Sequence, residues 1–286
     1  MASVTISTKD VSELRALTGA GMMDCKRALE ETGGDMEKAV ELLRKKGIAK
    51  AEKREGRSTS QGVVMIETSA DGREGAMIEL DCETDFVART DAFQALARAL
   101  ASHVAAHAEP GINAGNVEEQ VFVEGRTVAQ EIKQTSGKVG EVVTLKRFAR
   151  FAPKTGVVGF YLHHNGMVGT LVELEGGSGD AAQAAARDVA LHIAFADPIG
   201  INPEDVPAEL IDRERRIAEE QVAQEGKPEN IRGKIVDGKI RKFVAERTLL
   251  QQPFVRDDKT TVAQLLRAAG EGLTVTRFAR FKVGAA

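Results

Sequence analysis

The sequence predicts an α+β protein with a helical N-terminal module, followed by a core of two similar α+β subdomains. Three observations support this prediction. Apolar residues recur at helical spacing over roughly the first 47 residues, a set of strand and turn motifs occurs twice, and the second copy contains an insertion with helical patterning. We expect an N-terminal module with its linker over 1–54, a first core subdomain over 55–152 and a second over 153–286.

The N-terminal module is predicted to contain three short helices. Ser7 and Asp10 have the spacing of a capping box before the first helix, and Val11, Leu14 and Leu17 repeat along that helix as its apolar face. Breaks between the helices are expected at 18–21 and 32–35. Three short helices bury little apolar area, so we expect this module to be only marginally stable by itself.

An internal repeat is the strongest structural signal in the rest of the chain. Each copy begins with Gly-Val-Val, at 62–64 and 156–158, and contains two strand-like runs joined by Asp-Gly or Asn-Gly, which are typical of hairpin turns. Asp91 and Gln94 resemble a capping box for the helix that follows the first hairpin. An alanine-rich helix, a Thr-Val-Ala-Gln segment and an Arg-Phe-Ala-Arg-Phe strand then follow in the same order: 91–108, 127–130 and 147–151, and again 180–196, 261–264 and 277–281.

The extra length of the second copy predicts a helical hairpin (coiled coil) over about 204–247. Leu210, Ile217 and Val222 are expected on one face of its first helix, and apolar residues from Ile231 to Val244 on the second. A charged antiparallel hairpin that projects from the core fits this pattern. Its surface is a candidate for contact with a partner or for formation of a homodimer.

Composition and charge restrict the function classes. The net charge of −4 and the pI of about 5.9 argue against a nucleic-acid-binding protein, which usually has a strongly basic surface. The sequence has no run of ~18 apolar residues, and its first residues lack a signal or transit pattern, so we expect a cytoplasmic protein without membrane contact. Cys25 and Cys82 form no Cys-x-x-Cys pair, which suits a reducing compartment.

Catalytic and nucleotide-binding motifs are missing from the sequence, so we expect no chemical catalysis, no direct nucleotide binding and no cofactor. His103 and His107 have an i, i+4 spacing that can hold a metal, but surface histidines are the favoured interpretation, and a metalloenzyme is an alternative of low weight. Cys82 lies next to Glu83 and near Asp85. Acidic neighbours are expected to raise the pKa of this thiol, which argues against a nucleophile.

The segment from Glu83 to Val87 is a candidate contact site, because it places Phe86 next to a carboxylate where a hairpin ends and a helix begins. In one interpretation Thr84 or Asp85 caps that helix and Phe86 fills the core. In the other, Phe86 is exposed for contact. The second copy has Gly-Gly-Ser at 176–178, without Asp or Phe, and this difference favours contact because a core residue should occur in both copies.

Met22 and Met23 are a second candidate contact site. Core packing is one interpretation, but two adjacent residues at a helix start cannot both face inward. We therefore expect at least one of the two thioethers to be exposed, where its flexibility suits a partner surface.

The sequence resembles bacterial elongation factor Ts through several motifs together. These motifs are Leu14-Arg15, Thr18 to Lys26, Ala28-Leu29, Glu83 to Val87, Tyr161 to Gly166 and Gln252 to Val255. They cover nearly the whole chain in the order of that family. The duplicated core and the helical insertion also occur where the family has them.

The resemblance implies a guanine-nucleotide exchange factor for elongation factor Tu in translation elongation. It implies that the N-terminal module has a ubiquitin-associated-like three-helix fold and binds the GTPase domain near Met22 and Met23. In the second subdomain it implies contact through His163 or His164. The residues that the resemblance places near the magnesium and phosphate site of the partner are Thr84, Asp85, Phe86 and Val87. An adaptor or chaperone-like scaffold without exchange activity is the alternative from another functional class.

Overall fold

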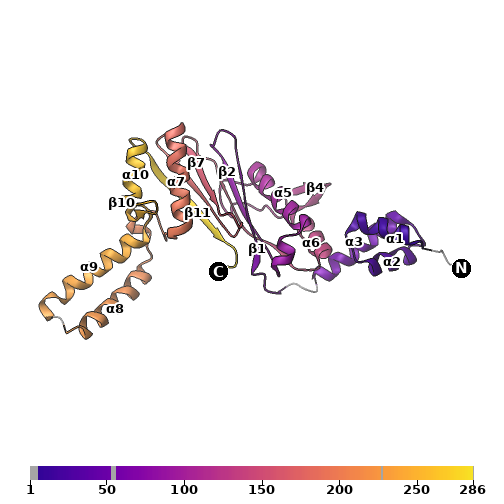
Figure 1. Ribbon diagram of the computed structural model, residues 1–286, viewed down its shortest axis with the longest axis horizontal. Coiled ribbons are helices and arrows are strands. Elements are labelled where there is room, and N and C mark those ends of the chain that lie inside the picture. Colours follow the sequence, from indigo (N-terminus) through magenta and orange to yellow (C-terminus); the bar gives the residue numbers. More distant parts are fainter. Residues whose placement is uncertain (1–5, 53–55, 227, 286) are drawn as a thin grey trace.

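The computed structural model describes residues 6–52, 56–226 and 228–285, and it confirms the predicted α+β class. Figure 1 shows an elongated molecule with helices α1, α2 and α3 at the N-terminal end and the main sheets in the middle. A hairpin of α8 (Ala208–Gln224) and α9 (Glu229–Arg247) projects at the opposite end. The N-terminal helices and the hairpin therefore lie far apart.

The N-terminal helices are α1 (Thr8–Thr18), α2 (Met22–Glu31) and α3 (Met36–Glu52). The predicted capping box is present, because Ser7 Oγ accepts from the backbone N–H of Asp10 and the Asp10 carboxylate accepts from that of Ser7, both at 3.1 Å. The three helices enclose a small core of Val11, Leu14, Cys25, Ala28, Leu29, Ala39 and Leu43.

The predicted position of Leu17 on the buried face of α1 is wrong, because this side chain is 63% exposed. On a helix of 3.6 residues per turn, Thr18 and not Leu17 continues the face that contains Leu14. The Thr18 hydroxyl is satisfied there by donating to the Leu14 carbonyl oxygen at 2.7 Å. Leu17 is therefore available at the surface.

The first sheet has four antiparallel strands, and helices cover one of its faces. In spatial order the strands are β1 (Gln61–Thr68), β2 (Gly75–Cys82), β6 (Val143–Phe151) and β3 (Gly111–Ile112). The associated helices are α4 (Asp85–Ala88), α5 (Asp91–His107) and α6 (Val128–Val139), with a small ribbon of β4 (Val121–Val123) and β5 (Arg126–Thr127) before α6. Phe93, Leu100, Ile78, Leu80 and Phe148 are among the residues buried between helix and sheet.

The N-cap of α5 is Thr90, so the predicted Asp91–Gln94 capping box is wrong. Thr90 has an extended backbone conformation, and its hydroxyl accepts from the backbone N–H of Phe93 at 3.3 Å. The Gln94 side chain instead donates to the Ala88 carbonyl oxygen at 2.8 Å, which links α5 to the preceding short helix.

The second sheet has three antiparallel strands, in the order β11 (Thr274–Lys282), β8 (Val168–Glu175) and β7 (Val157–Leu162). The remaining elements around it are α7 (Asp180–Ala196), α10 (Val262–Ala269), β9 (Pro253–Phe254), β10 (Asp257–Thr261) and the 3₁₀ turns η1 (Pro203–Asp205) and η2 (Leu249–Gln251). The two Thr-Val-Ala-Gln segments both begin helices, α6 and α10, with capping boxes.

The two sheets pack against each other through the faces that the helices do not cover. Their shared core consists of Val64, Met77, Ala149, Phe151, Val158, Leu171, Ala279, Phe281 and Val283. Glycines permit the close approach. A Cβ atom on Gly169 would lie 2.5 Å from Val64 Cγ1, and one on Gly75 would lie 2.9 Å from Val158 Cγ1. Because β2 lies between helices and the other sheet, every residue along it is buried.

The α8–α9 hairpin packs along a seam of Ala218, Val222, Val236 and Ile240, with Ile211 partly buried beside them. The prediction that Leu210 and Ile217 lie on this seam is wrong by one position, since Ile211 and Ala218 occupy it and Ile217 is exposed. The Arg215 guanidinium contacts the Asp237 carboxylate at 2.8 Å across the hairpin. Like the other described helices, neither α8 nor α9 is long and apolar enough to cross a membrane.

Candidate functional site

The segment from Thr84 to Val87 forms a single helical turn at the end of β2. Thr84 is the N-cap of α4, and its hydroxyl accepts from the backbone N–H of Val87 at 3.4 Å. Val87 and Ala88 are buried, whereas Phe86 is 81% exposed. The interpretation of Phe86 as a core residue is therefore wrong, because the two residues after it anchor the turn and leave its ring in solvent.

Asp85 lies next to the exposed ring and is itself half-exposed. Its carboxylate contacts the Arg89 guanidinium at 2.9 Å, one helical turn further on. Exposed ion pairs of this kind contribute little to stability. The Asp85 carboxylate can therefore exchange Arg89 for another group at small energetic cost, and an exposed aromatic ring and an exposed carboxylate are presented side by side.

Two glutamates connect this segment to the loop between α6 and β6. Thr84 donates to the Glu141 carboxylate twice, from its backbone N–H at 2.9 Å and from its hydroxyl at 2.6 Å. In the opposite direction, Glu83 Oε1 accepts from the backbone N–H of Val142 at 2.8 Å. Sequence reasoning did not identify Glu141, which is 57 positions from Thr84 and has no motif of its own.

Cys82 precedes this segment and is fully buried. Burial, followed by the charge of Glu141, raises the pKa of its thiol to about 12. The predicted direction is confirmed, but desolvation is a larger cause than the acidic neighbours. The thiol donates to the Thr84 carbonyl oxygen at 3.1 Å, so it is a structural group rather than a nucleophile.

Met22 and Met23 are both exposed, by 54% and 63%. They begin α2 directly after the glycine-containing break, and Leu17 near the end of α1 is exposed as well. Scattered exposed apolar residues are common, but three on adjacent helix ends make this end of the N-terminal helices a candidate contact surface. Of these three exposed residues, Leu17 is the one that the sequence prediction placed in the core.

His163 and His164 lie in the turn between β7 and β8, next to two aromatic side chains. The Tyr161 hydroxyl and His163 Nδ1 are 2.9 Å apart, and the rings of the two histidines are 4.3 Å apart between centroids. Phe195 of α7 is exposed and packs edge-on against His163, with centroids 5.9 Å apart. Phe195 is a further candidate that the sequence did not reveal, because only the fold brings α7 to this turn.

These candidate residues come from three separate segments of the chain. Met22 and Met23 belong to α2, Phe86 belongs to α4, and His163 belongs to the turn between β7 and β8; Figure 1 shows α2 well apart from the sheets. A partner that contacts all of them must itself be large. This arrangement fits a protein partner better than a small-molecule ligand.

The two histidines on α5 contact each other, and one of them also contacts a glutamine side chain. His103 is buried, which corrects its assignment to the helix surface, and its Nε2 lies 2.9 Å from Gln120 Oε1. Burial lowers the pKa of His103, and the centroids of its ring and the His107 ring are 4.7 Å apart. Among the described residues, no three His, Cys, Asp or Glu side chains converge in a way that could hold a metal ion.

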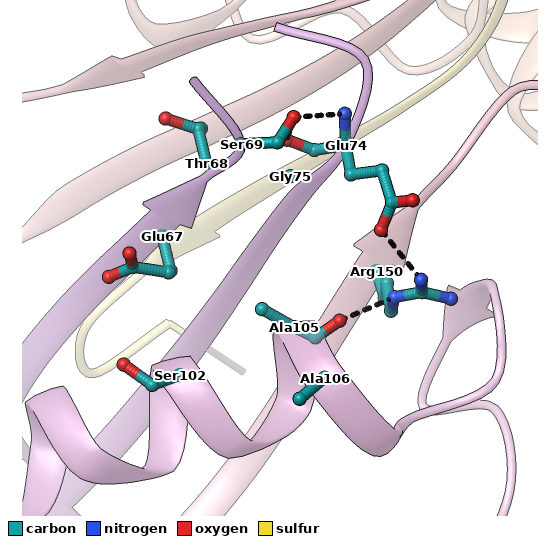
Figure 2. Close-up of a pocket in the computed structure, with 9 residues that line it drawn as sticks. All are labelled: Glu67, Thr68, Ser69, Glu74, Gly75, Ser102, Ala105, Ala106 and Arg150. Atoms are coloured by element: carbon teal, nitrogen blue, oxygen red, sulfur yellow. Dashed lines mark hydrogen bonds and ion pairs between the residues drawn. The ribbon is translucent and has the colours of Figure 1, made fainter. Parts of the chain in front are cut away.

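A cavity of about 310 Å³ lies between the first hairpin and α5 (Figure 2). Arg150 lines it, but its guanidinium is already bound to the Glu74 carboxylate at 2.7 Å and to the Ala105 carbonyl oxygen at 2.8 Å. Glu67 adds a second carboxylate to the lining. A cavity with two glutamates and one neutralised arginine is poorly suited to the phosphates of a nucleotide.

Comparison with known proteins gives a consistent result. The family model described as "Elongation factor TS" matches residues 83–285, starting at the segment that bears Phe86. A curated protein named Elongation factor Ts from Aquifex aeolicus is 43% identical over 98% of this chain and 99% of its own length. Proteins of the same name from Prosthecochloris aestuarii and Streptomyces griseus are 42% and 46% identical, over 98% and 96% of this chain and 99% and 97% of their own lengths.

Proposed function

The chain belongs to the elongation factor Ts family, and from this premise we propose that it is a guanine-nucleotide exchange factor for elongation factor Tu. The chain would bind the GDP-loaded GTPase and promote GDP release without catalysing a chemical reaction. The single observation that carries this proposal is the exposed Phe86 ring beside the Asp85 carboxylate, on a turn held to the rigid end of a sheet.

Exchange requires that the factor bind the nucleotide-free partner more tightly than the GDP-loaded one. By linkage, the nucleotide then weakens binding of the factor by the same ratio. A change in population from 1:99 to 99:1 needs about 5.5 kcal/mol of differential affinity. Burial of one phenylalanine ring contributes ~2–3 kcal/mol, so Phe86 is insufficient without other contacts.

The other contact surfaces are proposed to hold the partner while the turn acts on its nucleotide site. Met22 and Met23 would bind the GTPase domain, and His163 or His164 would bind elsewhere on the same protein. Phe86 would then displace side chains near the magnesium site of the partner. Asp85 would place a negative charge near the phosphates or the magnesium-bound water. Thr84 and Val87 hold the turn in place by capping and burial.

We further propose the division of the chain into 1–54, 55–152 and 153–286, with a ubiquitin-associated-like fold for the first unit. The α8–α9 hairpin is a candidate surface for a homodimer, and exposed Ile217 and Ile231 lie on it. Function is proposed to take place in the cytoplasm, without contact with nucleic acid or membrane.

Stopped-flow release of a fluorescent GDP analogue from elongation factor Tu tests the exchange activity. The wild-type chain is expected to accelerate release by orders of magnitude, and Phe86→Ala is expected to lose most of that acceleration. Val121→Ala is a matched control, since Val121 is also an exposed apolar residue but lies on the β4–β5 ribbon. Binding to GDP-loaded and nucleotide-free partner with equal affinity would instead identify a scaffold and refute exchange.

A further inference from the structure

The turn that presents Phe86 cannot hold its position through its own helical hydrogen bonds. Helix α4 has only four residues, and so short a helix has no independent stability. Contacts with the rest of the protein must therefore set the direction in which Phe86 points. Such contacts include the burial of Val87 and Ala88, the bond from the Gln94 side chain to the Ala88 carbonyl oxygen, and the bonds of Thr84 to Glu141.

We propose that Glu141 is a positioning residue for Phe86: its carboxylate fixes the first residue of α4 and thereby the direction of the exposed ring. This inference rests on the exchange function proposed above, and it assigns a role to a residue that is 57 positions from Thr84 in the sequence. Both oxygens of the Glu141 carboxylate accept hydrogen bonds from Thr84. It acts through Thr84.

The geometry of the contact suits this role. The two oxygens of Glu141 bind two different donors of Thr84, so the bonds fix the orientation as well as the distance. Hydrogen bonds to a charged acceptor are stronger than neutral ones, and these are partly buried. The reciprocal bond from Val142 to Glu83 prevents the two segments from sliding past each other.

Glu141 is itself held by the end of α6. Gly140 ends this helix in the left-handed conformation, with a φ of 81°, and donates from its backbone N–H to the Ser136 carbonyl oxygen at 3.0 Å. The Ser136 hydroxyl in turn donates to the Glu141 carbonyl oxygen. The carboxylate therefore projects from a well-defined backbone rather than from a free loop.

Helix α6 also supports the N-terminal helices. Gly137 lies so close to Gly47 of α3 that a Cβ atom on Gly137 would be 2.7 Å from the Gly47 carbonyl carbon. The surface with Met22 and Met23 and the turn with Phe86 are thus attached to the same helix. Glu141 is the side chain through which this common support reaches α4.

Hydrogen–deuterium exchange of the free protein tests the positioning without any partner. In Glu141→Ala, amide exchange in the peptide containing Thr84 and Ala88 is expected to rise about tenfold, since about 1.4 kcal/mol corresponds to a factor of ten and loss of a charge-assisted hydrogen bond costs about that much. Glu119→Ala is the matched control, because this glutamate is exposed and the Thr84 donors bind Glu141 instead. Unchanged protection in Glu141→Ala would overturn the inference.

Release of the GDP analogue provides the functional readout. In Glu141→Ala, the acceleration of GDP release is expected to fall about tenfold. The affinity of this variant for the nucleotide-free partner is expected to change less, because the other contact surfaces remain. In a Phe86→Ala background the Glu141→Ala change is expected to cause no further loss. If the two losses multiply, Glu141 acts independently of Phe86 and the inference is wrong.

A second variant, together with the wild-type result, keeps the outcomes distinct. Thr84→Val removes one of the two donors and keeps the shape of the side chain, so it repeats the test with a milder change if Glu141→Ala does not fold. A wild-type chain that does not accelerate GDP release would refute the proposed function. Wild-type acceleration that Glu141→Ala and Thr84→Val both retain would refute the positioning role alone.

Discussion

The guanidinium of Arg147 lies over the ring of Phe281, with Arg147 Cζ 4.7 Å from the ring centroid. A second contact joins the same two strands with the roles of the strands exchanged, since Arg277 Cζ lies 4.6 Å from the centroid of the Phe151 ring. Both arginines and both phenylalanines come from the two Arg-Phe-Ala-Arg-Phe strands. The repeated strands therefore cross-link the two sheets by exchanging cation–π contacts.

The first prediction concerns the ion pair between Arg147 and the buried Glu79 carboxylate. Arg147 Nε contacts the Glu79 carboxylate at 2.6 Å, and Glu79 is fully buried. Arg147→Met leaves that carboxylate without its cation and is expected to lower the free energy of unfolding by about 3–5 kcal/mol. Urea unfolding measures the change. Arg89→Met, which breaks an exposed pair, is the control and is expected to change stability by less than about 0.5 kcal/mol.

The second prediction concerns Asp81, which is fully buried and whose two carboxylate oxygens have no hydrogen-bond partner. Burial, and then the charge of Glu79, raises its pKa from 3.8 to about 6. Because the folded protein holds this proton more tightly than the unfolded chain, the contribution of Asp81 to stability is full below about pH 4 and is lost as the pH rises through about 6.

Asp81→Asn is therefore expected to raise the free energy of unfolding by about 2–3 kcal/mol at pH 8, and by much less at pH 4. Urea unfolding at the two pH values measures this difference. Glu67→Gln, at an exposed position of β1, is a control that should show no such pH dependence. A gain of equal size at both pH values would mean that packing, rather than loss of a charge, is responsible.

The third prediction compares glycines within helices. Gly137→Ala in α6 is expected to lower the thermal stability and loosen the N-terminal helices, because the added Cβ atom would collide with the backbone of Gly47. Gly238→Ala in α9 has open space around the new atom, so it is expected to stabilise the protein by about 0.5–1 kcal/mol through helix propensity. Thermal unfolding of both variants measures the contrast. Stabilisation by both changes would show that the α3–α6 contact is dispensable.

The fourth prediction concerns the exposed methionines. Replacing Met22 and Met23 together with alanine is expected to weaken binding to elongation factor Tu about tenfold, because roughly 1–3 kcal/mol of apolar burial is lost. The stability of the free protein should change little, since both side chains are exposed. Calorimetric titration measures the affinity. An unchanged dissociation constant would remove this surface from the proposed interface.

Features with local causes could be predicted from the sequence. The Ser7–Asp10 capping box depends on a spacing of three residues and forms as expected. Contacts between distant segments could not be predicted in this way. Glu141 meets Thr84 because β6 returns next to β2, and its own surroundings in the sequence contain no indication of that pairing. Leu17 was misplaced because a polar residue, Thr18, satisfied on the helix itself, continues the buried face.

The internal repeat also contains a histidine–glutamine pair that occurs in both copies. Gln120-Val121-Phe122-Val123 and Gln252-Pro253-Phe254-Val255 are equivalent segments, and each places its glutamine against a helix histidine. His103 Nε2 lies 2.9 Å from Gln120 Oε1, and His192 Nε2 lies 2.8 Å from Gln252 Oε1. Aligning the two copies to each other would have assigned His103 to the interior, because a duplicated histidine–glutamine pair indicates a shared structural role.

The contacts between the two sheets also have a consequence for synthesis of the protein. Phe281 lies on β11, which follows every other strand of the described chain. The apolar inner face of the first sheet, with Val64 and Met77, is completed by residues of the second sheet. While the ribosome is still translating the second half, the native cover of this face is incomplete. The nascent chain must therefore remain protected from aggregation until its last strand has emerged.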